Sequence, residues 1–201
     1  MNVLCFGGSF DPPHRGHELL LREVQRQFTY DLIVVVPVNI PAHKQVDHEI
    51  DPLYRLEMAR IAFSGIPQCV VDDREMSRGG VSYTYQTILE LETHWQPTEP
   101  ITLLVGYDLV PGLKRWKEWE QLRSRVRFLI AHRENEHIDS SLLEGVSWDS
   151  LDNPQVDVSS GMVRSVCTRG GDISGYVSPE VERYIIQRGL YGYHRADTSQ
   201  N

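Results

Sequence analysis

The chain has 201 residues, of which 40% are hydrophobic and 24% charged, as is usual for a folded globular domain. Its formal net charge of −8 argues against a long nucleic acid as the main partner, because proteins that bind one usually carry a basic face. No apolar run approaches the about 18 residues of a membrane span, and the N-terminus lacks the pattern of a signal peptide. The cysteines (Cys5, Cys69 and Cys167) are widely spaced and odd in number, which favours reduced thiols in the cytoplasm.

Apolar runs that end at glycine or proline predict strands, and apolar residues at helical spacing predict helices. In chain order, we expect a strand at 2–6, a helix at 16–28, a strand at 31–37, a loop at 38–51, a helix at 52–63, a strand at 69–71, a helix at 83–94, a strand at 101–105, a helical stretch with Trp116 and Trp119, a strand at 126–131, and helices at 160–168 and 178–188. We expect Ser82 to cap the third helix. The polar segment 133–153 supports no clear prediction.

The alternation of strands and helices predicts an α/β fold, a Rossmann-like doubly wound parallel sheet with helices on both faces. We expect one domain over residues 1–192, followed by a flexible tail at 193–201. Ligands of such sheets bind beyond the carboxyl ends of the strands. The segments that directly follow the strands are therefore the places where a site is expected.

The loop after the first predicted strand has the character of a phosphate site. Residues 7–17 read GGSFDPPHRGH. Gly7 and Gly8 allow backbone N–H groups to approach a ligand, and His14 and His17 lie three residues apart at a helix start, where both can face one site. The N-terminus of a helix attracts anions. A surface turn with incidental histidines is the alternative, but this setting favours phosphate binding.

Residues 8–17 resemble the GxFxPxHxGH signature of the nucleotidyltransferase superfamily, whose core is the HxGH element. The resemblance implies that His14 and His17 contact the phosphates of ATP and are the catalytic residues. It also implies that Ser9 and Phe10 lie along the nucleotide. This superfamily includes pantetheine-phosphate and glycerol-phosphate transferases, so the signature indicates the reaction class and leaves the acceptor open.

Further segments resemble the bacterial nicotinate-nucleotide adenylyltransferases in order and spacing. They are 36–44 (a P.N.PPHK element), 82–87 (SYT..T), 106–119 (G.D…W..W), 158–164 (ISST.IR) and the ending at 184–191. This resemblance covers about residues 1–192. It implies transfer of the adenylyl group of ATP to nicotinate mononucleotide, with release of pyrophosphate, in the synthesis of NAD.

Four more residues are expected at the ATP. Ser159 and Ser160 begin a helix and offer hydroxyls and free N–H groups, while Arg164, one turn later, can pair with phosphate oxygens through two N–H groups. Arg133 directly follows a strand and could also face the nucleotide.

The nicotinate ring is expected to lie between two segments. Ser82, Tyr83 and Thr84 open a helix and could receive the ring carboxylate, although a plain helix cap is the alternative. Trp116 could stack on the pyridinium ring, although core packing is the usual role of a tryptophan and is what we expect of Trp119.

Two charged residues complete the expected acceptor site. Asp108 directly follows a strand and could accept hydrogen bonds from ribose hydroxyls, with helix capping as the alternative. Lys44 could neutralise the acceptor phosphate, with an ordinary solvated loop lysine as the alternative.

The chemistry requires two anionic nucleotides to be held together, so we expect His14, His17, Arg164 and Lys44 to offset their repulsion. Mg²⁺ is expected with ATP, held by substrate phosphates and water, so no residue is assigned to a metal. By this resemblance, Gly161 stands where the family usually has threonine. This departure predicts a reduced or altered affinity for ATP, without loss of function.

Another transferase of the superfamily and a nucleotide sensor without turnover remain the rival interpretations. The degree of preference for the acid over the amide mononucleotide stays open. Whether the chain forms a homo-oligomer stays open as well.

Overall fold

The structure is a computed structural model that describes residues 1–42, 50–133, 138–153 and 156–193. Its centre is a parallel sheet of six strands in the order β4-β2-β1-β6-β7-β8. The strands are β1 (Val3–Gly8), β2 (Leu32–Pro37), β4 (Cys69–Val71), β6 (Thr102–Gly106), β7 (Arg127–Arg133) and β8 (Trp148–Asn153). A second sheet pairs β3 (Ile40–Pro41) with β5 (Val81–Ser82), also in parallel.

The order of the large sheet confirms the predicted Rossmann-like fold. Numbered by their appearance in the chain, its strands run 3-2-1-4-5-6, which is the order of doubly wound nucleotide-binding sheets. The direction of winding reverses between β1 and β6, and ligands of such sheets bind in the crevice at this position.

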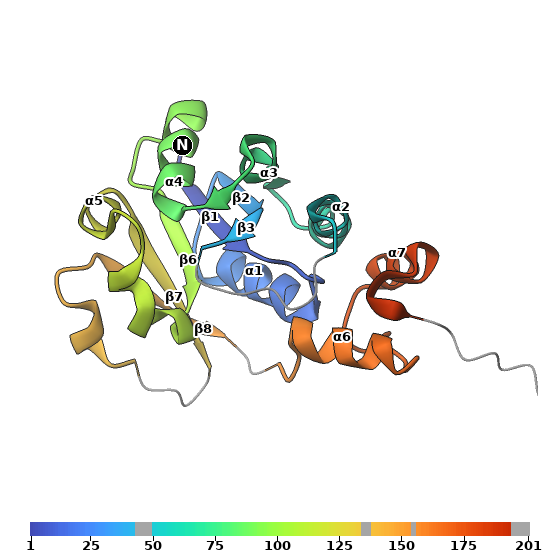
Figure 1. Cartoon of the computed structure of the whole chain (residues 1–201). Coiled ribbons are helices and arrows are strands. Elements are labelled where there is room, and N and C mark those ends of the chain that lie inside the picture. The colour runs from blue at the N-terminus through green and yellow to red at the C-terminus, as the bar shows by residue number, and fades with distance from the viewer. Residues whose placement is uncertain (43–49, 134–137, 154–155, 194–201) are drawn as a thin grey trace, which may run out of the picture.

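The helices are α1 (Arg15–Gln27), α2 (Pro52–Phe63), α3 (Arg74–Arg78), α4 (Thr84–Trp95), α5 (Trp119–Arg125), α6 (Ser160–Thr168) and α7 (Pro179–Arg188), with 3₁₀ segments η1 (Tyr107–Arg115), η2 (Ser140–Leu143) and η3 (Leu190–Gly192). Figure 1 shows α1, α2, α6 and α7 on one side of the sheet, and α4 and α5 on the other.

The two faces of the sheet bury separate hydrophobic clusters. Side chains alternate along a strand, so Leu4 and Phe6 of β1 pack in the first cluster, whereas Val3 and Cys5 pack in the second. Every residue of β2 is buried, as expected for a central strand covered on both faces. This packing fixes the carboxyl ends of β1 and β2 at one rim of the sheet.

Two elements differ from the expectation because their sequences carry little hydrophobic signal. In β8, Leu151 alone is fully buried, so its sequence looks polar although it pairs with β7 along its length. The helix α3 has five residues, too few to establish a helical period. The expected loop at 38–51 contains the short strand β3.

One local expectation was wrong. Ser82 does not cap a helix, because it belongs to β5 and Tyr83 is the N-cap residue of α4. Tyr193, the first residue of the expected tail, is 8% exposed and packs in the first cluster. Residues 194–201 lie outside the described part of the chain.

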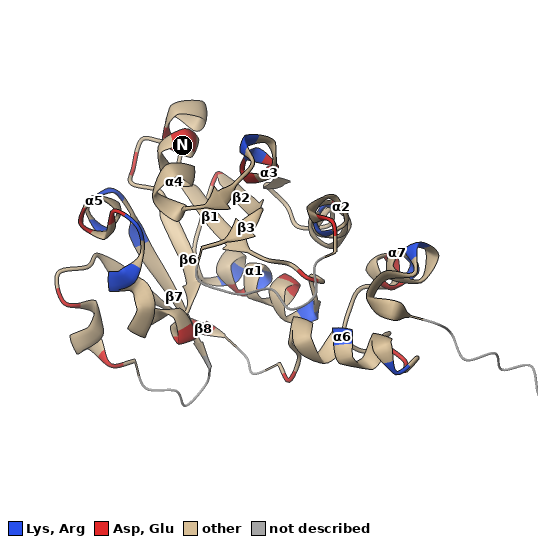
Figure 2. Ribbon diagram, in the orientation of Figure 1, with Lys and Arg blue, Asp and Glu red and all other residues tan. Residues whose placement is uncertain are grey.

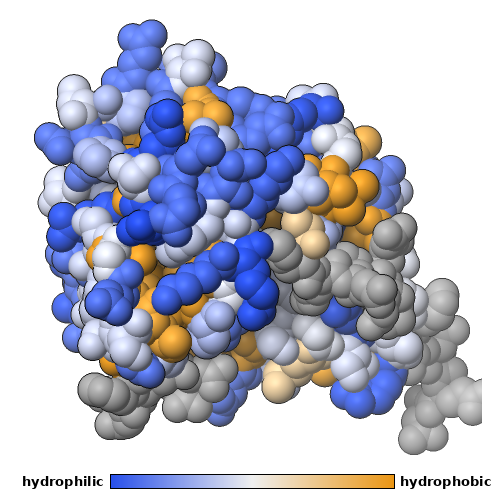
Figure 3. Space-filling view, turned by 60° about the vertical axis from the view of Figure 1, so that its left-hand side comes forward, coloured by the Kyte–Doolittle hydropathy of each residue, from blue (hydrophilic) through white to orange (hydrophobic). Residues whose placement is uncertain are grey.

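The surface mixes both signs of charge. Figure 2 shows basic and acidic residues together on α3, α5 and α7. Figure 3 shows a mainly hydrophilic face over the α4 and α5 side, with hydrophobic residues in separate patches. Among the described residues, no helix has the length and apolar character needed to cross a membrane.

Candidate active site

The glycine-rich loop connects β1, at the point where the sheet reverses its winding, to the first turn of α1. Gly7, Gly8 and Gly16 differ in how closely a side chain at each position would approach other atoms. A methyl group at position 8 would lie 2.8 Å from the Phe10 ring, and one at position 16 would lie 3.0 Å from His14 Nδ1. A methyl group at position 7 would meet no atom of the described residues within 4 Å. Gly8 and Gly16 are therefore needed for packing, whereas packing among the described residues does not require Gly7.

His14 and His17 lie together at the start of α1. Their rings stack with centroids 3.7 Å apart and an interplanar angle of 27°. His14 is the N-cap residue, and its backbone N–H donates to His17 Nδ1 over 3.1 Å. Because Nδ1 of His17 accepts this bond, the proton of the neutral ring lies on Nε2. The fold thus leaves His17 Nε2 as a hydrogen-bond donor.

Both histidines are neutral near pH 7. Burial lowers the pKa of His14 to about 4. Burial, and then the proximity of His14, hold the pKa of His17 well below its usual range. Without a ligand, the pair therefore offers directed donors, and not the positive charges that the sequence suggested. A bound phosphate would favour protonation of either ring.

The side chain of Phe10 packs in the core. Its side chain is 1% exposed and packs edge-to-face on Phe6 and Phe63, with centroids 5.3 Å away in each case. Phe10 has φ of +46°, a conformation that turns its side chain into the core. Only its backbone could approach a nucleotide, whereas Ser9 is partly exposed.

The helix α6 is hydrogen-bonded to the loop between β1 and α1 (residues 9–14), which we call the histidine loop. The bonds come from residues that were predicted to bind ATP. Arg164 donates to the carbonyl of Asp11 over 2.6 Å, and Ser160 Oγ donates to the carbonyl of Pro12 over 2.8 Å. Ser159 caps the helix by accepting from the N–H of Met162 at 3.2 Å. The structure brings these residues to the site, but the Ser160 hydroxyl proton and one Arg164 amine already serve the loop.

Asp11 links this loop to the end of the described chain. Its carboxylate is buried, accepts from Tyr191 Oη over 2.8 Å and lies 3.6 Å from Arg164 Nη1. Burial, and then the Asp11 charge, raise the pKa of Tyr191, so its hydroxyl remains a donor. The sequence indicated neither residue as part of the site, because their partnership spans 180 positions.

On the acceptor side, the loop after β2 is tied to β5. The N–H of Asn39 donates to Ser82 Oγ over 3.0 Å, and its side-chain amide donates to the carbonyl of Gly80 over 2.9 Å. Ser82 is buried, so its hydroxyl serves this contact within the fold. Tyr83 and Thr84 follow at the start of α4 and are partly exposed.

The turn between η1 and α5 approaches the start of α4. Lys117 Nζ lies 4.2 Å from the centre of the Tyr83 ring, a cation–π contact that sequence reasoning missed. Trp116 is half-buried at the end of η1, whereas Trp119 packs 5.7 Å from Phe128 in the core, as expected. The contact therefore brings the predicted stacking residue and the predicted carboxylate site into the same region.

Asp108 is exposed in the first turn of η1, after the end of β6. It does not cap that segment, because Gly106 is the N-cap residue. A methyl group at Gly106 would clash with the Asp108 carboxylate, so the glycine permits its position. Lys44 lies outside the described residues, and only the backbone of Arg133, the last residue of β7, is described.

Comparison with known proteins shows the family to which the chain belongs. The family model described as cytidylyltransferase-like matches residues 5–166. The nicotinate-nucleotide adenylyltransferase of Bacillus subtilis is 32% identical over 188 residues, which cover 92% of this chain and 96% of the relative. The probable nicotinate-nucleotide adenylyltransferase of Gemmatimonas aurantiaca is 36% identical over 197 residues, covering 95% of this chain and 92% of the relative. The chain belongs to the nicotinate-nucleotide adenylyltransferase family.

A solved structure of this family has the same fold. Nicotinic acid mononucleotide adenylyltransferase of Plasmodium falciparum, complexed with NaAD, has a TM-score of 0.80 and 25% identity, covering 97% of this chain and 99% of the other. The resemblance inferred from motif order is thereby confirmed, and it extends over the sheet and the helices on both faces.

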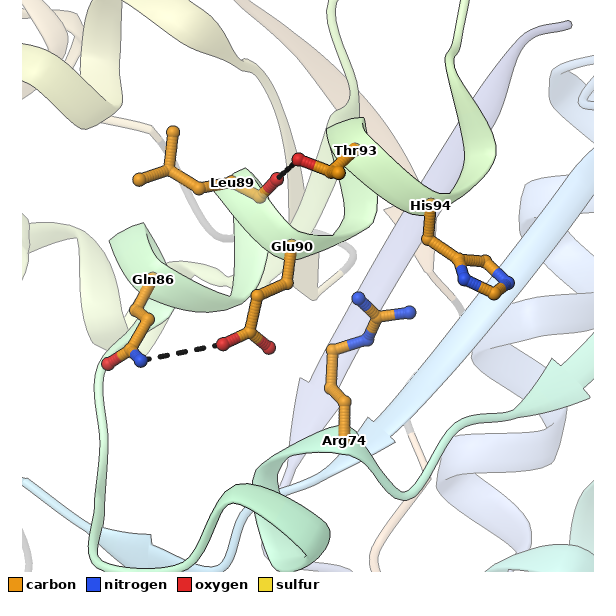
Figure 4. A pocket seen from close by; sticks show the side chains of 6 residues that line it. All are labelled: Arg74, Gln86, Leu89, Glu90, Thr93 and His94. Carbon is orange, nitrogen blue, oxygen red and sulfur yellow. Dashed lines mark hydrogen bonds between the residues drawn. The ribbon is translucent and has the colours of Figure 1, made fainter.

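A surface hollow in this family member shares no residue with the predicted site. Figure 4 shows Arg74 of α3 pointing toward α4, where Gln86, Glu90 and His94 line the same hollow. Arg74 is already held by Asp72, with 2.5 Å between Nη2 and Oδ2. None of the residues predicted for ATP or for the acceptor lines this hollow, so it does not extend the proposed site.

Proposed function

We propose that this chain transfers the adenylyl group of ATP to nicotinate mononucleotide, giving nicotinate adenine dinucleotide and pyrophosphate in NAD biosynthesis. The stacked pair of His14 and His17 carries the proposal, because it places a hydrogen-bond donor beside an anion-attracting helix start at the reversal point of the sheet. The full-length relatives named for this reaction support the choice of acceptor.

The chemical step joins two anions. An oxygen of the acceptor 5′-phosphate attacks the α-phosphorus of ATP, a new P–O bond forms, and pyrophosphate leaves with the electron pair of the broken bond. The attacking oxygen is already anionic, so no protein nucleophile is needed. The task of the protein is positioning and charge stabilisation.

The ATP side would use the histidine loop and the start of α6. His17 Nε2 and His14 would donate to phosphate oxygens, with the backbone at Gly7, Gly8, Ser9 and Phe10 along the nucleotide. The Arg164 amine that Asp11 does not hold, together with Ser159 and Ser160, would face the phosphates from α6. Arg133 remains a further proposed contact.

The acceptor side would use the start of α4 and the turn after η1. Tyr83 and Thr84 would receive the ring carboxylate, Trp116 would stack on the pyridine ring, and Asp108 would accept from ribose hydroxyls. Ser82 supports this site through its bond to Asn39. Lys44 remains the proposed partner of the acceptor phosphate.

Mg²⁺ would enter this site together with ATP. Among the described residues, no group of three or more histidine, cysteine or carboxylate side chains could hold a metal ion. Magnesium usually keeps several waters and binds substrate phosphates, so ATP itself would be its main ligand. When bound, it would supply positive charge to the phosphate oxygens, while the residues named above orient the two nucleotides.

The decisive experiment measures pyrophosphate release from ATP and Mg²⁺ with nicotinate mononucleotide and, side by side, with its amide. We expect turnover of the acid form, with nicotinate adenine dinucleotide identified by mass, and the ratio of the two kcat/KM values gives the preference. Binding of ATP without pyrophosphate release would indicate a nucleotide sensor. Turnover with pantetheine phosphate alone would indicate another transferase.

We also propose that the protein works in the cytoplasm. Its three cysteines are free thiols, as in reducing compartments.

A further inference from the structure

Arg55 is a buried arginine whose hydrogen bonds go to backbone carbonyls. It lies in α2 and is 7% exposed. Its Nη1 donates to the carbonyl of Ser9 over 2.8 Å and to that of Val38 over 2.6 Å, while Nη2 donates to the carbonyl of Asn39 over 2.9 Å. Burying a charged group is costly unless it is well hydrogen-bonded, and these three bonds meet that requirement.

The three carbonyls belong to two different loops. Ser9 lies in the loop after β1, which leads to the histidine pair. Val38 and Asn39 lie in the loop after β2, and the Val38 N–H also donates to the carbonyl of Gly8 over 2.9 Å. One guanidinium therefore bridges the ends of two adjacent strands.

The second loop continues this connection to the acceptor side. Asn39 is bonded to Ser82 and Gly80, which directly precede the start of α4. A chain of hydrogen bonds thus runs from Ser9, through Arg55 and Asn39, to the segment before Tyr83.

We infer that Arg55 is a positioning residue that holds the ATP-binding loop and the acceptor-binding segment at a fixed separation. This inference rests on the proposed function. The reaction needs the acceptor oxygen in line with the α-phosphorus, and a displacement of about 1 Å can lower the rate of such a step about 100-fold. The rigid fork of a guanidinium suits this task, because it directs several N–H groups in one plane.

Arg55 stays charged in this setting. Burial lowers the pKa of Arg55, and the nearby Asp11 carboxylate opposes that effect. An arginine does not lose its proton in proteins, so all of its N–H groups remain donors.

The test compares Arg55→Lys, which keeps the charge but loses the planar fork, with Arg55→Met, which loses both. The matched control is Arg60→Lys on the same helix, where the arginine is exposed and pairs with Glu57 at 2.6 Å and Asp73 at 3.4 Å. Pyrophosphate release gives kcat and both KM values, at a temperature well below the melting point of every variant.

We expect both Arg55 variants to lose about tenfold to 100-fold in kcat, with each KM within about threefold of the wild type. The control should match the wild type. Wild-type kcat in Arg55→Lys would overturn the inference, as would a rise in KM with kcat retained, or a lower melting temperature as the sole effect. If the wild type itself releases no pyrophosphate, the proposed function fails and this inference fails with it.

If neither Arg55 variant folds, Asn39→Ala decides the matter, because it leaves Arg55 in place and removes the tie to Gly80. We then expect a fall in kcat of about threefold to tenfold with little change in either KM. Unchanged kcat, or a rise in the KM for nicotinate mononucleotide alone, would overturn the inference.

Discussion

The His17 imidazole at the start of α1 has two separate tasks. The His17 Nδ1 atom completes the helix cap by accepting from the His14 backbone, and this bond sets the tautomer that leaves Nε2 as a donor. One ring thus serves the fold at one nitrogen and is free for a phosphate at the other. Substitutions that mimic only one nitrogen can separate these two roles.

His17→Asn keeps an acceptor near the Nδ1 position and removes the Nε2 donor, whereas His17→Gln keeps a donor near Nε2 and loses the cap. If the donor acts mainly in the transition state, His17→Asn should lower kcat about 100-fold to 1000-fold with little change in KM. His17→Gln should retain more activity and lose more stability. Steady-state kinetics and thermal melts measure both, and the reverse order of the two variants would contradict the assignment.

The low pKa of His14 makes stability depend on pH. Its value of about 4 in the folded protein lies below the 6.5 of an unperturbed histidine. Between these values, the unfolded chain binds a proton that the folded chain does not, so the free energy of unfolding falls as the pH is lowered from 6.5 toward 4. Urea titrations at pH 7.5 and pH 5 give the free energy of unfolding at each pH. The difference between the two values should be smaller for His14→Asn than for the wild type. The exposed His94→Asn serves as the control, and equal pH dependence in all three proteins would refute the explanation.

The helix α6 tightens the histidine loop through contacts made from its first two turns. Ser159 caps the helix, while Ser160 and Arg164 bond to the carbonyls of Pro12 and Asp11. Between them lies Gly161, which is exposed and offers no side chain. A methyl group there would meet its nearest neighbours, Arg164 Nη2 and Ser159 Oγ, at 3.9 Å, so a side chain fits without strain.

Gly161→Thr should therefore add the hydroxyl that the resemblance to the ISST.IR element implies at this position. We expect the KM for ATP to fall about threefold to tenfold, equivalent to one added hydrogen bond of about 1 kcal/mol, with kcat maintained. Gly161→Val has a similar shape without the hydroxyl and removes the same glycine from the helix. Identical ATP kinetics in the two variants would assign the effect to helix propensity alone.

The sequence predicted best the elements that carry a strong hydrophobic pattern. β1 and β2 are buried and apolar, so both strands and the parallel sheet were correctly predicted. β8 was missed because it is an edge strand with polar side chains, and α3 because it is one short turn of helix.

The prediction of the candidate site from the sequence was limited in the same way, because it also depended on distinctive sequence signals. Motif order indicated the histidines and the start of α6, since these residues have distinctive types. Arg55 carried no such signal, because carbonyls occur in every residue and its partners lie 16 to 46 positions away. Asp11 and Tyr191 were not indicated for the same reason of distance along the chain.

The whole molecule builds its site from three layers that meet at one rim of the sheet. The first cluster holds α1, α2, α6 and α7 against one face, and the second holds α4, α5 and η1 against the other. The proposed ATP side therefore rests mainly on the first cluster and the proposed acceptor side on the second. Their common support is the sheet itself, with β1 at the junction.

The last described residues belong to this architecture. A chain that stops after Gly189 loses Leu190 and Tyr193 from the first cluster and the Tyr191 bond to Asp11, whereas one that stops after Tyr193 retains them and should unfold at a higher urea concentration. Removing two large buried side chains should cost at least about 4 kcal/mol of unfolding free energy. Urea denaturation of the two truncated proteins tests this, and similar midpoints would show that the segment does not contribute to the fold.

The bond between Asp11 and Tyr191 also sets an order of events during translation. Asp11 leaves the ribosome long before Tyr191, since 180 positions separate them. The nascent polypeptide can therefore pair β1 with β2 early, yet its histidine loop gains this anchor only when the segment around Tyr191 emerges. We expect catalytic competence to arise only after that point, so that fragments that end before Tyr191 would be inert.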